Sequence, residues 1–255
     1  MEKPAIRAIL FDKDGTLFDF EATWRGAAET VLDALSQGDA GLRATLADAV
    51  GYDPVAGRFA PGSPLVVGAT REVAEILAAH LPSLDAGALE RAADAAAVAA
   101  DPAPAATDLP ALLGGLRARG LALGVATHDS EGAARAHLSA AGALDAFDFV
   151  AGYDSGHGLK PGPGMVLAFA EAVATPPETI VMVGDSVHDL GAARAAGAGL
   201  AVGVLTGPAT RDILAPMADA VLASIMELPA LLDAAGGRDA RPTPGGVPAP
   251  PARAI

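Results

Sequence analysis

The chain has 255 residues, of which 51% are hydrophobic, and its formal net charge is −14. This charge argues against a nucleic-acid surface, which needs a basic stripe, and against electrostatic binding to anionic membranes. The absence of cysteine excludes disulfides, thiolate catalysis and zinc–thiolate sites. No apolar run has the length of a signal peptide or a membrane span, so we expect a cytoplasmic protein, a monomer or homodimer, without nucleic-acid or membrane partners.

Short apolar runs rich in branched residues predict buried strands, and helical patterns separate them. The expected strands are 5–11, 121–126, 147–152, 179–183, 200–205 and 220–223. The expected helices between them are 108–119, 130–141, 163–174, 187–196 and 209–215. Alternation at this spacing predicts an α/β fold with a doubly wound parallel sheet, in which ligands bind beyond the carboxyl ends of the strands.

The segment 20–105 interrupts the alternation with a purely helical pattern. Its helical stretches are 21–37, 41–51, 65–81 and 85–100. We therefore expect an α/β core made of 1–19 and 106–235, with 20–105 inserted as a small helical domain that returns to the sheet through the linker 101–110. The final segment, 236–255, is rich in Pro and Gly without apolar periodicity, which predicts a disordered tail.

Two aspartates follow the first expected strand in the sequence FDKDGT. In an extended segment Asp12 and Asp14 point the same way and Lys13 points the other way. Two adjacent carboxylates are costly unless a cation or a shared proton compensates them, and a divalent metal would do so. Gly15 allows a sharp turn after them. The alternative is that Asp-x-Asp-Gly forms only a surface turn.

Two further expected strands are followed by groups suited to binding phosphate. Thr127 ends one strand, where a hydroxyl before a helix can meet a phosphate oxygen. The alternative is that Thr127, Asp129 or Ser130 caps the helix that follows. Lys160 stands in a Gly/Pro-rich loop before a helix, which suits a compact point charge, although a solvated loop lysine is the alternative.

The strand at 179–183 runs into Gly184 and Asp185, and Asp189 comes one helical turn later. Gly184 allows close backbone approach, and the two aspartates can share a face as the helix begins. The alternative is that these acids only cap the helix and favour its dipole. Taken together, the strand ends offer carboxylates for a hard cation such as Mg²⁺, and a hydroxyl and an ammonium for an anion.

In this order the motifs closely resemble those of haloacid dehalogenase-like (HAD) superfamily phosphohydrolases. They are DKDGT at 12–16, VAT ending at Thr127, LKPGP around Lys160 and VGDSVHD at 183–189. The resemblance implies a Rossmann-like HAD core and makes the insert 20–105 an alpha-helical cap. Within the superfamily the arrangement most resembles phosphoglycolate phosphatase-like enzymes.

The resemblance also implies roles for the acids. Asp12 would be the nucleophile that forms an aspartyl-phosphate, and Asp14 would be the general acid and then the general base. Mg²⁺ would be held by Asp12, the backbone carbonyl of Asp14 and Asp185. Dehalogenating members of the superfamily lack the second acid, so Asp14 argues for a phosphatase or a phosphomutase.

The remaining implied roles concern the phosphoryl group. Thr127 and Lys160 would bind its oxygens, together with backbone N–H groups after Asp12. Asp189 would lie near the metal or orient Lys160, and Gly15 and Gly184 would support the site. The cap would close over the site and exclude water.

The expected substrate is a small phosphorylated metabolite, with 2-phosphoglycolate as the first choice. A sugar phosphomutase similar to beta-phosphoglucomutase is the alternative enzyme, and a phosphate-sensing protein on a retained fold is the non-enzymatic alternative. Arg25, beside Trp24, is the candidate partner for a substrate carboxylate, unless it is a surface arginine; Arg58 and Arg71 are further candidates.

Two residues depart from the superfamily pattern. Lys13 occupies a position that is more often apolar or aromatic, and His128 stands where Asn or a small polar residue is frequent. Neither residue alters the roles above, and the sequence assigns no role to either.

Overall fold

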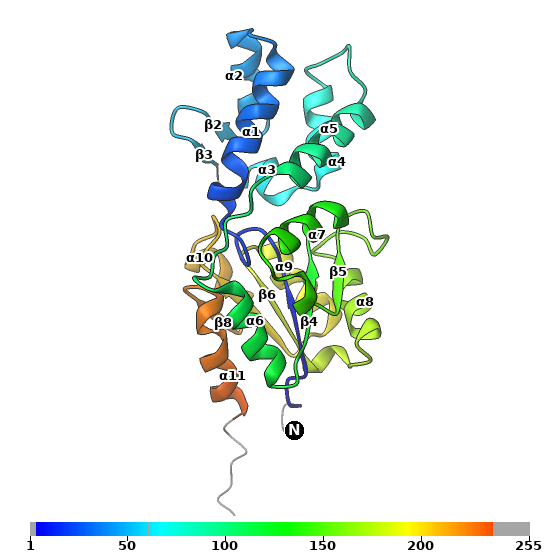
Figure 1. The fold of residues 1–255 in the computed structure, drawn as a ribbon, viewed down its shortest axis with the longest axis vertical. Helices are drawn as coiled ribbons and strands as arrows, with labels where there is room; N and C mark the ends of the chain where they lie inside the picture. Colours follow the sequence, from blue (N-terminus) through cyan, green and yellow to red (C-terminus); the bar gives the residue numbers. More distant parts are fainter. Residues whose placement is uncertain (1–3, 61, 237–255) are drawn as a thin grey trace, which may run out of the picture.

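A computed structural model describes residues 4–60 and 62–236. It consists of an α/β core and a helical part that stands above one edge of the sheet (Figure 1). Of the expected tail 236–255, only Gly236 is described, as the last residue of a helix, and 237–255 lie outside the described residues. No helix in the described part of the chain has the length and apolarity needed to cross a membrane.

The core is built on a six-stranded sheet with the strand order β5–β4–β1–β6–β7–β8. Its strands are β1 (Ala8–Phe11), β4 (Ala122–Ala126), β5 (Phe149–Ala151), β6 (Ile180–Gly184), β7 (Leu200–Val204) and β8 (Ala220–Leu222). All neighbouring strands pair in parallel, which confirms the predicted doubly wound α/β fold. β1 lies at the centre, with Leu10 opposite both Gly124 and Met182.

Helices cover both faces of the sheet. They are α6 (Leu109–Ala118), α7 (Glu131–Ala140), α8 (Gly164–Ala172), α9 (Val187–Ala196), α10 (Arg211–Leu214) and α11 (Leu228–Gly236), with short 3₁₀ turns η1 (Leu144–Ala146), η2 (Pro177–Thr179) and η3 (Ile225–Glu227). The sequence pattern did not predict α11. It is a short helix at the end of the described chain.

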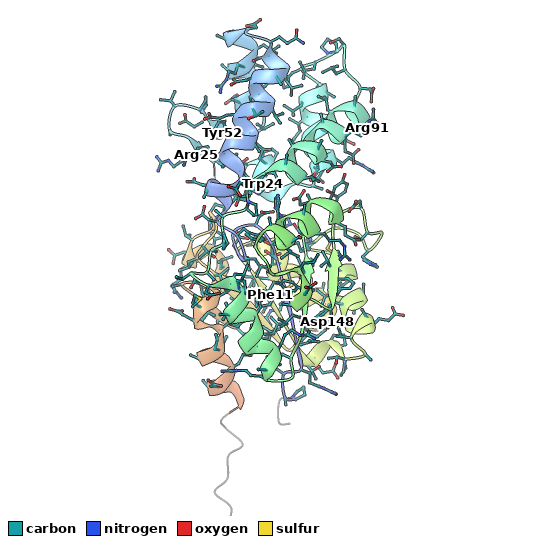
Figure 2. The ribbon with its side chains drawn as sticks, viewed as in Figure 1. Phe11, Trp24, Arg25, Tyr52, Arg91 and Asp148 are labelled. Atoms are coloured by element: carbon teal, nitrogen blue, oxygen red, sulfur yellow. The ribbon has the colours of Figure 1, made fainter. Side chains whose placement is uncertain are left out.

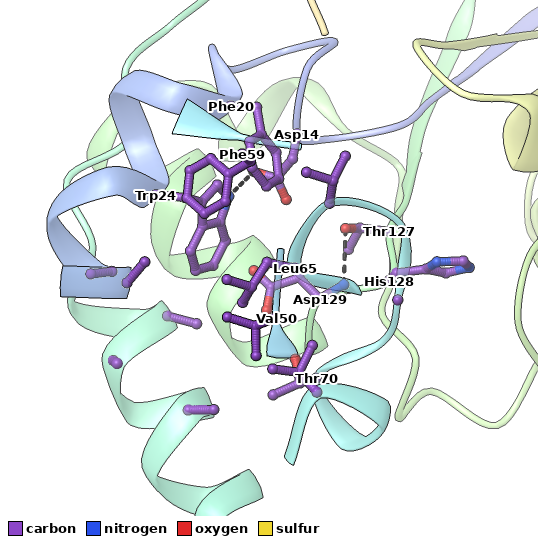
Figure 3. Close-up of a pocket in the computed structure, with 18 of the residues that line it drawn as sticks. Asp14, Phe20, Trp24, Val50, Phe59, Leu65, Thr70, Thr127, His128 and Asp129 are labelled. Atoms are coloured by element: carbon purple, nitrogen blue, oxygen red, sulfur yellow. Dashed lines mark hydrogen bonds between the residues drawn. The ribbon is translucent and has the colours of Figure 1, made fainter. Parts of the chain in front are cut away.

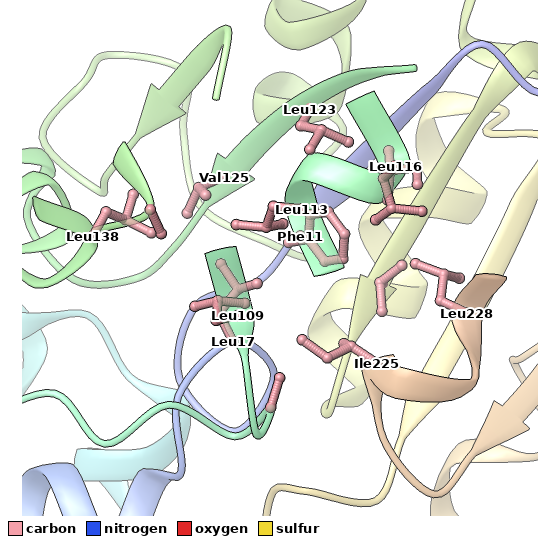
Figure 4. Packing of buried hydrophobic residues seen from close by; sticks show 14 of the residues in the cluster. Phe11, Leu17, Leu109, Leu113, Leu116, Leu123, Val125, Leu138, Ile225 and Leu228 are labelled. Atoms are coloured by element: carbon pink, nitrogen blue, oxygen red, sulfur yellow. The ribbon is translucent and has the colours of Figure 1, made fainter. Parts of the chain in front are cut away.

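Alternating residues of β1 build two hydrophobic cores, because successive side chains of a strand point to opposite faces. Ile9 and Phe11 pack into the cluster formed with α6, α7 and α11 (Figure 4). Leu10 packs into the other, with Phe169 of α8 and Leu190 of α9. Burial on both faces explains why the strand is an uninterrupted apolar run in the sequence.

The helical part, called the cap below, comprises residues 20–99. It contains α1 (Phe20–Ser36), α2 (Ala40–Ala49), α3 (Pro64–Val67), α4 (Thr70–Ala78) and α5 (Ala86–Ala99), and a small hairpin, β2 (Tyr52–Asp53) with β3 (Arg58–Phe59). The cap has a hydrophobic core of its own, to which Leu32, Leu46 and Leu77 belong.

The cap differs in two places from the expected four helical stretches. The stretch 65–81 is divided into α3 and α4, because Gly68 leaves the helix and the Glu72 carboxylate accepts a hydrogen bond from the Ala69 N–H. The hairpin was not predicted, because two-residue strands show no alternation. Its turn is fixed by Asp53, whose carboxylate accepts from the backbone N–H groups of Val55 and Ala56.

The two chain segments that connect cap and core lie side by side. The Asp19 N–H donates to the carbonyl of Ala103 at 2.8 Å, and the Ala105 N–H donates to the carbonyl of Leu17 at 2.9 Å. These bonds join the outgoing and returning segments into a short two-stranded connection.

Candidate active site

The carboxyl ends of the strands open into a cavity between core and cap, with a volume of ≈ 140 Å³. Asp12 and Asp14 after β1, Thr127 after β4, Lys160 after β5 and Asp185 after β6 all line it. This convergence follows from the parallel sheet, which brings the carboxyl ends of its strands to one edge.

Lys160 lies at the base of this cavity between two carboxylates. Its Nζ donates to Oδ1 of Asp12 and to Oδ1 of Asp189, both at 2.6 Å, and to the carbonyl of Ala126 at 2.9 Å. Burial would lower the pKa of Lys160, but the two carboxylates outweigh burial and raise it. Lys160 is therefore a fixed positive charge beside Asp12.

Three acids meet at the same place. The carboxylates of Asp12, Asp185 and Asp189 offer oxygens that all lie within 4.8 Å of one another. Burial raises the pKa of Asp12 to about 7, although Lys160 opposes the rise. Burial, and next the charge of Asp12, raise the pKa of Asp185 well above its usual range. Lys160 alone does not compensate three acids, and a set of hard oxygen donors fits Mg²⁺.

Glycines allow the backbone to approach these acids closely. Gly15 has a φ of +74°, and a Cβ on it would overlap the carboxylate of Asp185. A Cβ on Gly207 would overlap the same carboxylate, and one on Gly184 would overlap Asp189. The chain thus leaves room for the acids where any larger residue would displace them.

The carboxylate of Asp14 lies outside the three-acid cluster and is held from two sides. It accepts a hydrogen bond from Lys13 Nζ at 2.8 Å and one from Trp24 Nε1 of α1, also at 2.8 Å. The expectation that Lys13 points away from the acids is wrong. β1 ends at Phe11, so the two-residue alternation of a strand does not extend to this position, and the long lysine side chain reaches Asp14.

Lys13 is fully buried in a polar cluster beneath the cap. Besides Asp14, its Nζ lies 3.2 Å from Oδ2 of Asp129, 3.0 Å from Nδ1 of His137 and 5.1 Å from the centre of the Trp24 ring. Burial would lower the pKa of Lys13, but Asp14 and Asp129 outweigh it and raise the pKa. Lys13 therefore stays charged in the protein interior.

His137 of α7 connects this cluster to the cap. Its Nε2 lies 2.7 Å from the carbonyl of Ala97 in α5. A carbonyl only accepts, so Nε2 carries the proton and Nδ1 of the neutral ring accepts from Lys13. Burial, and next the charge of Lys13, lower the pKa of His137. The sequence did not single out His137; its only signal was its helical spacing from Ala133 and Ala134, which places it on the buried face of α7.

The structure distinguishes the helix caps from the candidate phosphate ligands. Ser130 caps α7 by accepting from the Ala133 N–H, and Thr127 Oγ1 accepts from the Asp129 N–H at 3.1 Å (Figure 3). At α9, Ser186 and Asp189 form reciprocal cap bonds. Asp189 thus caps its helix with one oxygen while the other accepts from Lys160.

The candidate arginines lie away from the cavity. Arg25 is half-exposed, pairs with Glu21 at 3.8 Å, and lies on the outer side of α1, whereas Trp24 faces the boundary with the core (Figure 2). Arg58 is exposed on β3, and Arg71 is exposed and pairs with Glu90. None of the three is among the described residues that line the cavity.

The sequence is similar to those of known hydrolases and phosphatases. Residues 6–197 match a family of hydrolases described as haloacid dehalogenase-like hydrolase. A phosphoglycolate phosphatase of Rhodospirillum rubrum is 41% identical over 102 residues, which are 39% of this chain and 42% of that protein. A phosphoglycolate phosphatase of Escherichia coli K12 is 37% identical over 123 residues, 47% of this chain and 48% of that protein. The chain thus spans less than half the length of these curated relatives.

Solved structures share the fold. A putative haloacid dehalogenase-like hydrolase from Bacteroides fragilis superimposes with a TM-score of 0.66 at 21% identity, over 88% of this chain and 99% of that one. At this identity the likeness concerns the fold alone, and it extends over cap and core together.

Proposed function

Because the chain belongs to the haloacid dehalogenase-like hydrolase family, we propose that it is a Mg²⁺-dependent phosphatase that hydrolyses a small phosphomonoester through an aspartyl-phosphate. The observation that carries the proposal is the meeting of four strand ends at one cavity, where they contribute Asp12, Thr127, Lys160 and Asp185. Lys160 Nζ, 2.6 Å from Asp12 Oδ1, provides positive charge beside the proposed nucleophile.

Asp12 and Asp14 divide the proposed chemistry between them. A carboxylate oxygen of Asp12 attacks phosphorus, the bond from phosphorus to the ester oxygen breaks, and Asp14 gives its proton to the leaving alkoxide. Asp14 then takes a proton from water as the water oxygen attacks phosphorus, which releases phosphate and restores Asp12. The Trp24 and Lys13 hydrogen bonds fix the Asp14 carboxylate for both proton transfers.

The remaining residues serve the phosphoryl group. Lys160 and the Thr127 hydroxyl bind its oxygens, with backbone N–H groups after Asp12, and Asp189 keeps Lys160 in place. Asp12, Asp185 and the backbone carbonyl of Asp14 would hold the metal. Bound Mg²⁺ supplies the positive charge that offsets the crowded acids and the phosphoryl oxygens.

The sequence-based substrate is 2-phosphoglycolate, and the names of the two curated relatives support it as the reference compound for assays. The phosphomutase alternative needs a second phosphate site in the cap. The cap residues that line the cavity include neither Lys nor Arg among those described, which favours hydrolysis.

The nucleophile assignment is tested by phosphate release from p-nitrophenyl phosphate. We expect Asp12→Asn to abolish release, and the exposed Asp145→Asn to leave it within about twofold of the unaltered protein. EDTA should abolish release, and added Mg²⁺ should restore it. Release by Asp12→Asn at the unaltered rate would overturn the nucleophile assignment.

A further inference from the structure

The cavity is polar at its base and apolar at its roof. Its base is polar, with Asp12, Thr127, Lys160 and Asp185. Its roof belongs to the cap and is almost wholly apolar (Figure 3). The roof residues include Phe20, Trp24, Ala27, Phe59 and Ala96. A phosphomonoester with its phosphoryl group at the base must place its leaving group against this roof.

The roof has an aromatic side and a small-residue side. Phe20 and Phe59 meet edge to face with ring centres 5.0 Å apart, next to Trp24. The lining residues of α5 are all alanines, Ala96 among them, and α1 adds Ala27 and Ala28 beyond its aromatic residues. The short alanine side chains leave space between the two helices, whereas larger residues at these positions would fill it.

Positive charge is confined to the base. Lys160 is the only lysine or arginine among the described residues that line the cavity, and it is already bound to Asp12 and Asp189. His128 and His188 also line it, at the core side. A carboxylate on the leaving group would therefore lose its hydration against the roof without gaining an ion pair, which is unfavourable.

We propose, on the basis of the phosphatase function above, that the preferred substrate is a phosphomonoester of an uncharged, apolar alcohol, a short alkyl or aryl group, rather than of a hydroxy acid. The cavity of ≈ 140 Å³ is large enough for several water-sized groups, so a short leaving group fits beside the phosphoryl group. Hydrolysis releases the neutral alcohol, with its hydroxyl proton supplied by Asp14, and inorganic phosphate.

The decisive comparison is isobutyl phosphate against 2-phosphoglycolate, because the isobutyl group replaces the carboxylate with an apolar branch of nearly the same shape. We expect kcat/KM for isobutyl phosphate to be higher by about tenfold or more. Equal or better hydrolysis of 2-phosphoglycolate overturns this inference and leaves the phosphatase function standing. Failure to release phosphate from either compound, while p-nitrophenyl phosphate is hydrolysed, overturns this inference alone. Failure with all three compounds overturns the phosphatase function and the inference with it.

A series of unbranched alkyl phosphates measures the contact with the roof. From methyl to butyl phosphate, kcat/KM should rise by about fourfold for each methylene that the roof buries. A flat series contradicts the inference, because an apolar roof in contact with the leaving group must distinguish chain lengths.

Substitutions on α5 locate the leaving group. Ala96→Leu extends into the space between α1 and α5, and it should lower kcat/KM for butyl phosphate about tenfold while methyl phosphate changes less than about twofold. Ala95→Leu is the matched control, since Ala95 is exposed on the same helix. An Ala96→Leu profile identical to that of the control overturns the placement of the leaving group in this space.

Discussion

The two buried lysines that contact the paired aspartates have the same charge but different surroundings. Lys160 lines the cavity and touches Asp12, which is the acid proposed to attack phosphorus. Lys13 is fully buried, is not among the described lining residues, and touches Asp14 and Asp129. From this contrast we propose that Lys160 serves the substrate, whereas Lys13 compensates the protein's own acids.

Lys160→Met should cause the larger loss of activity. It removes the one ammonium that the described residues place at the base of the cavity, and the loss of a positioned donor to a reacting oxygen lowers kcat by about 10²–10³-fold. The measurement is phosphate release from isobutyl phosphate or p-nitrophenyl phosphate. Arg71→Met removes an exposed cation of the cap and should stay within about twofold of the unaltered protein. A comparable loss in Arg71→Met would show that the effect is not specific to the cavity.

Lys13→Met should cause the larger loss of stability. Breaking a buried ion pair leaves Asp14 and Asp129 without their cation and lowers the free energy of unfolding by about 3 kcal/mol. Urea unfolding measures this change. The double variant Lys13→Met/Asp129→Asn should regain part of the stability, because one uncompensated charge is removed. If Lys13→Met has the same free energy of unfolding as the unaltered protein, Lys13 does not compensate the charges of Asp14 and Asp129.

Trp24→Phe should reduce activity about tenfold. It removes the hydrogen bond to the Asp14 carboxylate, and bonds to charged groups contribute about 1.5–3 kcal/mol. The control is Tyr52→Phe, which removes the cap hydrogen bond to Glu29 away from the acids. The measurement is steady-state kcat for both variants. Equal losses in kcat would show that the hydrogen bond from Trp24 does not support Asp14 in catalysis.

His137 should produce the smallest effect, a pH dependence of stability. Its pKa in the folded protein is below the ordinary value of 6.5, so the unfolded chain takes up more protons as pH falls past 6.5. The stability that depends on neutral His137 is present above that pH and is lost below it. His137→Asn does not titrate, and urea unfolding at pH 7 and at pH 5.5 should show a smaller change for it than for the unaltered protein. The control is His157→Asn at an exposed position, for which the loss of stability between pH 7 and pH 5.5 should equal that of the unaltered protein. The same loss in His137→Asn would show that His137 does not cause the pH dependence.

The sequence predicted the core well because each buried parallel strand is a distinct apolar run. The residue after such a run lies at the carboxyl edge, so Asp12, Thr127 and Asp185 could be expected to meet before any coordinates were known. Lys160 required one further inference, from the stiff loop in which it stands. The order of these motifs also predicted the family correctly.

The surroundings of Lys13 could not be predicted in the same way. They depend on how α1 and α5 lie over the core, which brings Trp24 to Asp14 and the Ala97 carbonyl to His137. Cap and core contribute to these contacts from positions far apart in the chain, and no local pattern encodes the docking. The hydrophobic roof could not be predicted for the same reason. Its alanines look like ordinary helix residues in the sequence, and only the placement of the cap over the core brings them to the cavity.

The paired connection between cap and core has a mechanical consequence. Because Asp19 is bonded to Ala103 and Ala105 to Leu17, neither connecting segment can bend alone without breaking a backbone hydrogen bond. A displacement of the cap would therefore have to move both segments together, and one that separated α1 from the core would also break the hydrogen bond from Trp24 to Asp14. A displaced cap would thus leave the proposed proton donor with only one of its two positioning hydrogen bonds, the one from Lys13.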